Sequence, residues 1–237
     1  MPKISIIGDT HGYLDKMIAN ITSDTDFVLQ VGDFGVYLKD SNLSSIPEHR
    51  REQLGQFNKY FEARKSFPVP VYFCKGNHED FEFLQKYESK NEILKNLFYV
   101  TNGSVMDIQG VVVAFLGGNF SPKWFEKETP NFNPKHSQNH KIFGYLRKAE
   151  IDTILNYPGK IDILITHEPS FGPEFQVQSN PRPYGCQAIQ DLIEEIQPDY
   201  AFSGHIHKFA EGQIGKTKCV ALGAVNYEAQ SVWELFI

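Results

Sequence analysis

Short runs of β-branched and apolar residues alternate along this chain with amphipathic stretches, and this alternation limits the possible fold more than any other feature. The segments "KISIIG" at 3–8 and "DFVLQVG" at 26–32 have the composition of buried strands. Between them, the apolar residues of 13–21 recur at helical spacing. Residues 3–32 therefore predict a strand–helix–strand unit.

The same pattern predicts further elements across the 237 residues. Helices are expected at 45–65, 80–87, 91–97, 147–156 and 186–197, and strands at 68–76, 161–167, 199–205, 218–224 and 231–237, with a hairpin over 104–118. No repeat and no linker interrupts them. We expect one α/β domain over 1–237, with two mixed sheets packed face to face and helices outside. A polar, Pro- and Asn-rich stretch at about 119–148 is expected to be a surface insertion.

Composition narrows the possible functions. The formal net charge of −6 argues against a general nucleic-acid or membrane-surface binder, so nucleic acid is a possible but not a favoured partner. Cys74, Cys186 and Cys219 form no CxxC motif, and we expect them to be small buried residues in a reducing cytoplasm. The chain shows neither a signal-peptide pattern nor an apolar run long enough to span a bilayer, so we expect no membrane partner.

Polar side chains follow the predicted strands at the points where they end. Five successive strand ends carry Asp9 and His11, then Asp33, then Asn77 and His78, then His167, and finally His205 and His207. In open α/β sheets the carboxyl ends of the strands form the ligand crevice, so these side chains are expected to converge. Imidazole and carboxylate groups suit divalent Mn, Fe or Zn.

Two such ions about 3.5–4 Å apart can clamp a phosphoryl group and generate a hydroxide nucleophile. One carboxylate must then bridge them, and Asp33 is the natural candidate because it stands alone at its strand end. Each motif is ambiguous when taken singly. Asp9 could cap a helix, and His167 could be a satisfied buried histidine. Their ordered recurrence favours the metal interpretation.

In this order, "GDTHG", "VGDFG", "KGNHED", "THEP" and "SGHIH" resemble the calcineurin-like metallophosphoesterase superfamily over about residues 4 to 208. The resemblance implies a four-layer α/β/β/α sandwich with a dinuclear site. It implies that Asp9, His11, Asp33 and His207 hold one divalent ion, and that Asp33, Asn77, His167 and His205 hold the other. Manganese is preferred, with Fe, Zn, Ni, Co or Mg as alternatives. His78 would lie beside the phosphate as a proton donor or a transition-state stabiliser.

Two acids follow His78 directly. Glu79 and Asp80 could orient His78 or raise its pKa, or they could favour the N-terminus of the next helix. We favour the helix for Asp80 and leave both readings open for Glu79.

Departures from the superfamily's patterns narrow the range of candidate substrates. "GDFGVYL" lacks the second Asp and the Arg of the serine/threonine phosphatase motif G-D-x-x-D-R-G, and the chain looks more like the phosphodiesterase branch. "GDFG" with "GNHE" is also similar to RNA lariat debranching enzymes. Trp124 in the insertion and Arg182 and Tyr184 in the loop after 168 are candidate substrate contacts. Alternatively, the aromatic residues of the insertion pin it to the body, and Arg182 merely lines the rim of the cleft.

We therefore expect a dinuclear metal-dependent phosphoesterase that acts on a small phosphorylated substrate or nucleotide, with a phosphodiester preferred. The alternatives are a phosphomonoesterase, a nuclease, or a binding module that keeps its metals but uses its surface for partners. The sequence does not indicate the oligomeric state.

Overall fold

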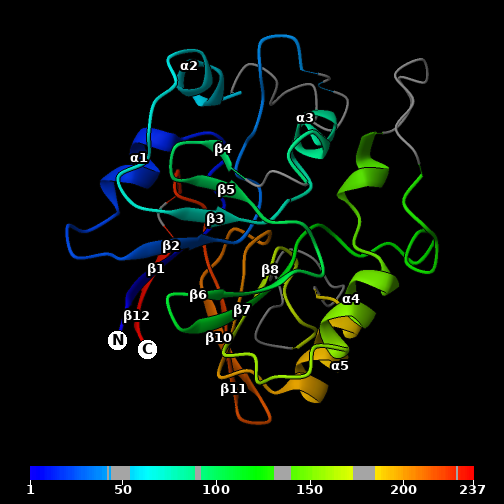
Figure 1. Ribbon diagram of the computed structural model, residues 1–237. Helices are drawn as coiled ribbons and strands as arrows, with labels where there is room; N and C mark the ends of the chain where they lie inside the picture. The colour runs from blue at the N-terminus through cyan, green and yellow to red at the C-terminus, as the bar shows by residue number, and fades with distance from the viewer. Residues whose placement is uncertain (42, 44–53, 89–91, 131–139, 173–184, 228) are drawn as a thin grey trace.

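Two mixed sheets of six strands each form the centre of the molecule (Figure 1). The structure, a computed structural model, describes residues 1–41, 43, 54–88, 92–130, 140–172, 185–227 and 229–237. The first sheet has the order β12 (Val232–Phe236), β1 (Lys3–Ile7), β2 (Phe27–Gln30), β3 (Val71–Phe73), β5 (Leu97–Tyr99) and β4 (Glu92–Leu94). The second has the order β10 (Ala210–Ile214), β11 (Thr217–Ala221), β9 (Tyr200–Ser203), β8 (Ile163–Thr166), β7 (Val111–Leu116) and β6 (Val105–Ile108).

The central strands of both sheets are parallel. β1, β2, β3 and β5 pair in parallel in the first sheet, as do β7, β8, β9 and β11 in the second. The predicted strand–helix–strand unit is β1, α1 (Leu14–Ala19) and β2. Because parallel strands run the same way, their carboxyl ends meet at one edge of each sheet.

Side chains on alternate positions divide the interior into three apolar layers. Phe27 and Leu29 of β2 face the second sheet, whereas Val28 faces the helices. The outer face of the first sheet packs against α1, α2 (Phe57–Glu62) and α3 (Phe81–Gln85). That of the second packs against α4 (Lys148–Leu155) and α5 (Gln187–Ile196), and a 3₁₀ helix, η3 (His140–Gly144), precedes α4. Full burial of one such apolar side chain contributes about 1.5–3 kcal/mol. The predicted four-layer sandwich is confirmed.

The helix predicted at 91–97 is wrong, because the described part of this segment forms the β4–β5 hairpin. Ile93, Leu94 and Leu97 have the spacing of a helix stripe, but Asn96 has a φ of 66° and turns the chain. Pairing of β5 with β3 then decides the conformation, since tertiary contacts override local propensity.

Other expectations have mixed outcomes. The hairpin over 104–118 is β6 and β7. Of the helix predicted at 45–65, residues 57–62 form α2, and 45–53 lie outside the described residues. The edge strand β10 was not predicted, because Glu211, Gly212 and Gln213 have low β-propensity. All three cysteines are buried free thiols, as expected. Among the described residues, none of the helices has the length and apolar character needed to traverse a bilayer.

Candidate metal centre

Strand ends from both sheets bring the predicted ligand side chains into one cluster. Its members are Asp9 and His11 after β1, Asp33 after β2, Asn77 after β3, His167 after β8, and His205 and His207 after β9. They lie in two groups that share Asp33.

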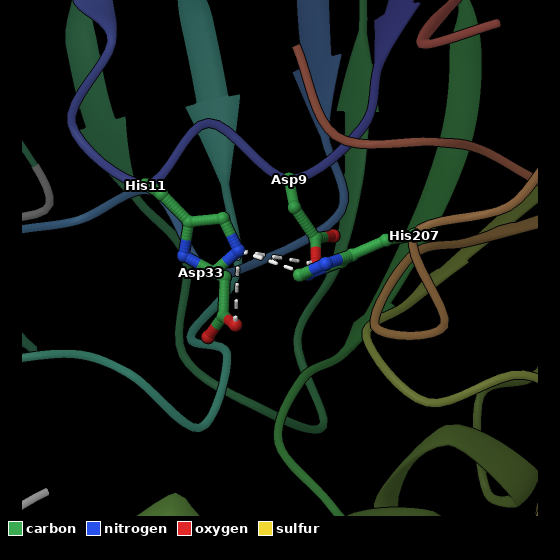
Figure 2. A group of neighbouring side chains, drawn as sticks. All are labelled: Asp9, His11, Asp33 and His207. Carbon is green, nitrogen blue, oxygen red and sulfur yellow. Dashed lines mark hydrogen bonds and ion pairs between the residues drawn. The ribbon is translucent and has the colours of Figure 1, made fainter. Parts of the chain in front are cut away.

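The first group consists of Asp9, His11, Asp33 and His207, whose side chains point toward one another (Figure 2). Nε2 of His207 is 2.9 Å from Nε2 of His11 and 2.9 Å from Oδ2 of Asp9. Nε2 of His11 is 3.8 Å from Oδ2 of Asp33. One donor atom from each of the four residues lies within 4.8 Å of the others, so a single ion could contact all four.

The second group lies on the other side of Asp33 and includes Asn77, His167 and His205. Nε2 of His167 is 3.0 Å from Oδ1 of Asn77 and 3.6 Å from Oδ1 of Asp33. The rings of His167 and His205 meet edge to face, with their centroids 5.0 Å apart. Asp33 thus directs Oδ2 at the first group and Oδ1 at the second, which is the geometry that a bridging carboxylate requires.

The backbone of the cluster adopts conformations that side chains usually disfavour. His11, Asp33, His205 and His207 have φ values of 46°, 50°, 66° and 52°. Each such residue costs on the order of 1 kcal/mol or more, and such strain concentrates at functional sites. A Cβ on Gly76 would collide with Oδ1 of Asp33, so this turn requires glycine.

Burial and the neighbouring groups together set the protonation of the donors. Burial alone would raise the pKa of Asp33, but the nearby imidazoles of His167, His78 and His11 outweigh it and hold the pKa well below its usual range. Burial lowers the pKa of His11, and burial together with His167 lowers that of His205 to about 4. At neutral pH these donors are deprotonated, which is the state that binds cations.

The donor set fits divalent cations. Asp9 and Asp33 are 0% and 1% exposed, and in the described part of the chain their ion-pair partners are histidines, with no Lys or Arg. Buried carboxylates without a cationic partner are costly, and bound cations would remove that cost. Nδ1 of His167 lies 3.0 Å from the carbonyl oxygen of Val31, to which it can donate, so that Nε2 keeps its lone pair for a cation.

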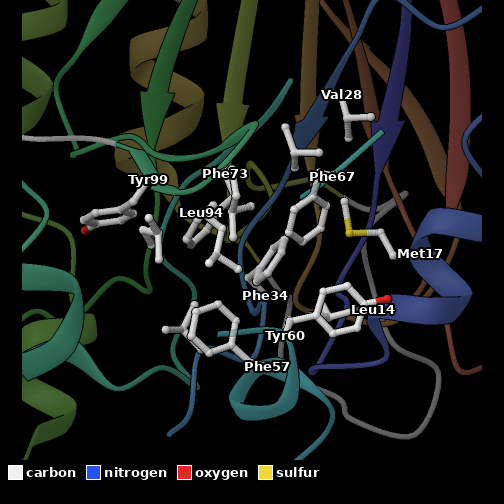
Figure 3. Close-up of a cluster of buried hydrophobic side chains, with 14 of the residues drawn as sticks. Leu14, Met17, Val28, Phe34, Phe57, Tyr60, Phe67, Phe73, Leu94 and Tyr99 are labelled. Carbon is white, nitrogen blue, oxygen red and sulfur yellow. The ribbon is translucent and has the colours of Figure 1, made fainter. Parts of the chain in front are cut away.

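Glu79 holds the Asp33 loop in place. The oxygens of its buried carboxyl group accept hydrogen bonds from the backbone N–H groups of Phe34, Gly35 and Val36, at 2.7, 3.1 and 2.8 Å. Phe34 lies in the aromatic core under the loop (Figure 3). Its ring centroid is 4.5 Å from that of Phe73. Burial, aided by the charge of Asp33 and opposed by these N–H donors, raises the pKa of Glu79 to about 8. Glu79 therefore joins the loop after β3 to the loop after β2.

We expect Glu79→Gln to lower the free energy of unfolding by about 1–3 kcal/mol. An amide can place an oxygen at only one of the two carboxylate positions, so at least one buried backbone N–H loses its acceptor. Urea unfolding measures the change. Glu82→Gln on α3 is the matched control, because Glu82 is 40% exposed and its loose pair with Lys86 contributes little. Equal stabilities of the two variants would contradict this role of Glu79.

His78 lies beside the first group. Its backbone N–H donates to Oδ1 of Asp33 at 2.7 Å, and its ring centroid is 5.9 Å from that of His11. Asp80 caps α3, with its side chain accepting from the N–H of Phe83 at 3.0 Å, so the helix interpretation is confirmed for Asp80. Asp9 does not cap α1, since the N-cap there is Tyr13.

Two further strand ends reach the cluster and were not predicted. Asn119 follows β7, and its Nδ2 lies 3.4 Å from Nε2 of His205. Tyr227 follows β11, is 51% exposed, and has its ring 5.3 Å from that of His207. The rule that located the other residues, a polar side chain after an apolar strand, would have found both.

Of the three predicted substrate contacts, the structure describes only Trp124. Arg182 and Tyr184 lie outside the described residues, as do 131–139 of the insertion. Trp124 has the cationic groups of Lys123, Lys127 and Arg147 within 5.7 Å of its ring centroid. Arg147 is buried and donates to the carbonyl oxygens of Trp124 and Ile142, at 2.8 and 2.7 Å. Arg147 therefore joins the two ends of the segment and is not free to hold a phosphate.

Comparison with known proteins gives a family match over most of the chain. The family model described as calcineurin-like phosphoesterase matches residues 2–209. Lariat debranching enzymes are among the similar curated proteins. Those of Drosophila melanogaster and Homo sapiens are each 25% identical over 88% of this chain, covering 43% and 42% of their own lengths. The enzyme of Saccharomyces cerevisiae is 25% identical over 86% of this chain and 56% of its own. The chain thus spans about half the length of these relatives.

Solved structures share the fold. One crystal structure superposes with a TM-score of 0.66 at 19% identity, covering 95% of this chain and 92% of that one. A phosphopantetheinyl hydrolase from Mycobacterium tuberculosis superposes with a TM-score of 0.53 at 13% identity, covering 99% of this chain and 96% of that one. At such identities the likeness concerns the fold alone.

Proposed function

The chain belongs to the calcineurin-like phosphoesterase family, and on that premise we propose that it is a phosphodiesterase that uses two divalent cations. The observation that carries the proposal is the position of Asp33, whose two carboxylate oxygens face two separate groups of nitrogen and oxygen donors. We propose Asp9, His11, Asp33 and His207 as ligands of the first cation, and Asp33, Asn77, His167 and His205 as ligands of the second. Manganese is the metal to test first.

When bound, the two cations would polarise the phosphoryl group and activate water as the nucleophile. The protein's own side chains supply the remainder. The aspartates and imidazoles would hold the cations in place, and Glu79 keeps the Asp33 loop in position by binding its backbone. His78, held by its backbone bond to Asp33, is proposed to give a proton to the leaving-group oxygen. No serine or cysteine nucleophile is needed.

The substrate class rests on two arguments. The loop "GDFGVYL" lacks the second Asp and the Arg of the serine/threonine phosphatase motif, which favours a diester over a phosphoprotein. The curated relatives are named lariat debranching enzymes, so we propose testing a branched (lariat) RNA as a substrate beside nucleotides and dinucleotides. We propose a phosphodiester as the substrate and, from the absence of a linker in the sequence, a single domain over the whole chain. A cytoplasmic location is also proposed.

We expect the manganese-loaded protein to hydrolyse bis-p-nitrophenyl phosphate faster than p-nitrophenyl phosphate. EDTA should reduce the rate to the uncatalysed background, and Mn²⁺ added back should restore it. The reason is that, in the described part of the chain, no Lys or Arg pairs with Asp9 or Asp33 and could replace the positive charge of the cations. Absorbance of released p-nitrophenolate measures both rates. A faster monoester rate would favour the phosphomonoesterase alternative, and a rate that survives EDTA treatment would contradict the metal proposal.

A further inference from the structure

Asn119 has an amide that is only half satisfied. Its Nδ2 lies 3.4 Å from Nε2 of His205, while its Oδ1 is buried and has no hydrogen-bond partner among the described residues. An asparagine amide keeps its shape when it turns by half a revolution about its Cβ–Cγ bond, so oxygen and nitrogen can exchange positions. The side chain therefore has two orientations that offer His205 opposite hydrogen-bonding groups.

The two orientations differ in what they leave for a cation. If Nδ2–H donates to Nε2 of His205, that nitrogen's lone pair is engaged and Nδ1 of the neutral ring carries the proton, so neither nitrogen can bind an ion. If Oδ1 faces His205, Nε2 carries the proton and donates it, and Nδ1 keeps its lone pair. Histidines that bind metals commonly donate their other N–H in this way. His167 follows the same rule, since its Nδ1 faces the carbonyl oxygen of Val31.

The backbone around Asn119 is held on several sides, so the amide is delivered to a fixed position. Its N–H donates to the carbonyl oxygen of Gly144, and its carbonyl oxygen accepts from Leu146, both at 2.9 Å. The N–H of Phe120 donates to the carboxylate of Glu168, the neighbour of His167. The end of β7 is thereby tied to the loop that follows β8, which carries His167 of the second group of donors.

We propose that Asn119 is a positioning residue whose amide oxygen accepts a hydrogen bond from Nε2–H of His205, leaving Nδ1 of that ring as the nitrogen that binds the second cation. This inference rests on the proposed two-cation function. It assigns to the end of β7 a part in the site that the sequence motifs do not include.

Calorimetric titration of the full chain with Mn²⁺ tests the proposal. Asn119→Leu keeps the volume but has no acceptor, and we expect it to weaken the second cation about 10- to 100-fold while leaving the first unchanged. Asn119→Asp is an acceptor only, and should bind both cations at least as tightly as the wild type. Asn156→Leu, at the exposed C-cap of α4, is the matched control and should have no effect.

A second readout is the tautomer of His205 in the zinc-loaded protein, observed by long-range ¹H–¹⁵N NMR. We expect an Nε2-protonated ring in the wild type and in Asn119→Asp. Unchanged affinities in Asn119→Leu would overturn the proposal, as would an equal fall for both cations or an Nδ1-protonated ring in the wild type. The proposed function fails separately, if a wild type that binds two ions hydrolyses no phosphate ester.

Discussion

Asp33→Asn should bind at most one divalent cation per chain and should hydrolyse diesters at least about 10³-fold more slowly, a loss of roughly 4 kcal/mol of transition-state stabilisation. Asp33 is 1% exposed and directs one carboxylate oxygen at each group of donors. An amide has no charge and a single oxygen, so it cannot serve both. Metal content after dialysis, together with the rate on bis-p-nitrophenyl phosphate, measures the two effects.

The substitution is expected to leave the fold intact. Asparagine tolerates the positive φ of 50° at this position, and its oxygen can still accept the N–H of His78. Urea unfolding of the metal-free proteins checks this point. Asp40 is an exposed acid on the same segment after β2, so Asp40→Asn is the matched control. It should bind two cations and hydrolyse the diester at the wild-type rate. Full activity of Asp33→Asn would contradict a bridging role for this carboxylate.

His78→Gln should lower kcat by roughly 10²- to 10⁴-fold on a nucleoside phosphodiester, the usual contribution of a general acid. Loss should be much smaller on bis-p-nitrophenyl phosphate, because p-nitrophenolate leaves without being protonated. This difference arises because His78 is proposed to act on the leaving oxygen and is not proposed as a ligand. Initial rates on both substrates, with the same Mn²⁺ loading, measure it.

Two outcomes would contradict that role for His78. Equal losses on the two substrates would show that His78 does not act by protonating the leaving-group oxygen. A change in the number of bound cations would show that the ring, beside His11 with 5.9 Å between centroids, belongs to the metal site itself. We expect the cation count to stay at two.

The fold could be predicted because its signals are local. Alternation of apolar runs with helical stripes identified β1, α1 and β2, and the polar residues after β1, β2, β3, β8 and β9 marked the edge where the strands end. The same rule applied to β7 and β11 would have found Asn119 and Tyr227. They were missed because they belong to none of the motifs that drew attention to the other strand ends.

Other features depend on contacts that the sequence does not encode locally. Residues 92–97 have a helical apolar spacing, and only the pairing of β5 with β3 makes them strands. Arg147 reads as one more cation of a polar insertion, yet it is 3% exposed and bonded to two backbone carbonyls. The three backbone N–H groups that donate to Glu79 lie 43 to 45 residues away in sequence. The sequence also does not predict the positive φ angles at His11, His205 and His207, because residues with a Cβ seldom adopt that conformation.

The most direct test of the whole account is a crystal structure of the manganese-loaded protein with an anomalous difference map. The account predicts two peaks about 3.5–4 Å apart on either side of the Asp33 carboxylate, one near His11 and His207 and the other near His167 and His205. A map with no peak at Asp33, or with its peaks on other parts of the molecule, would contradict it.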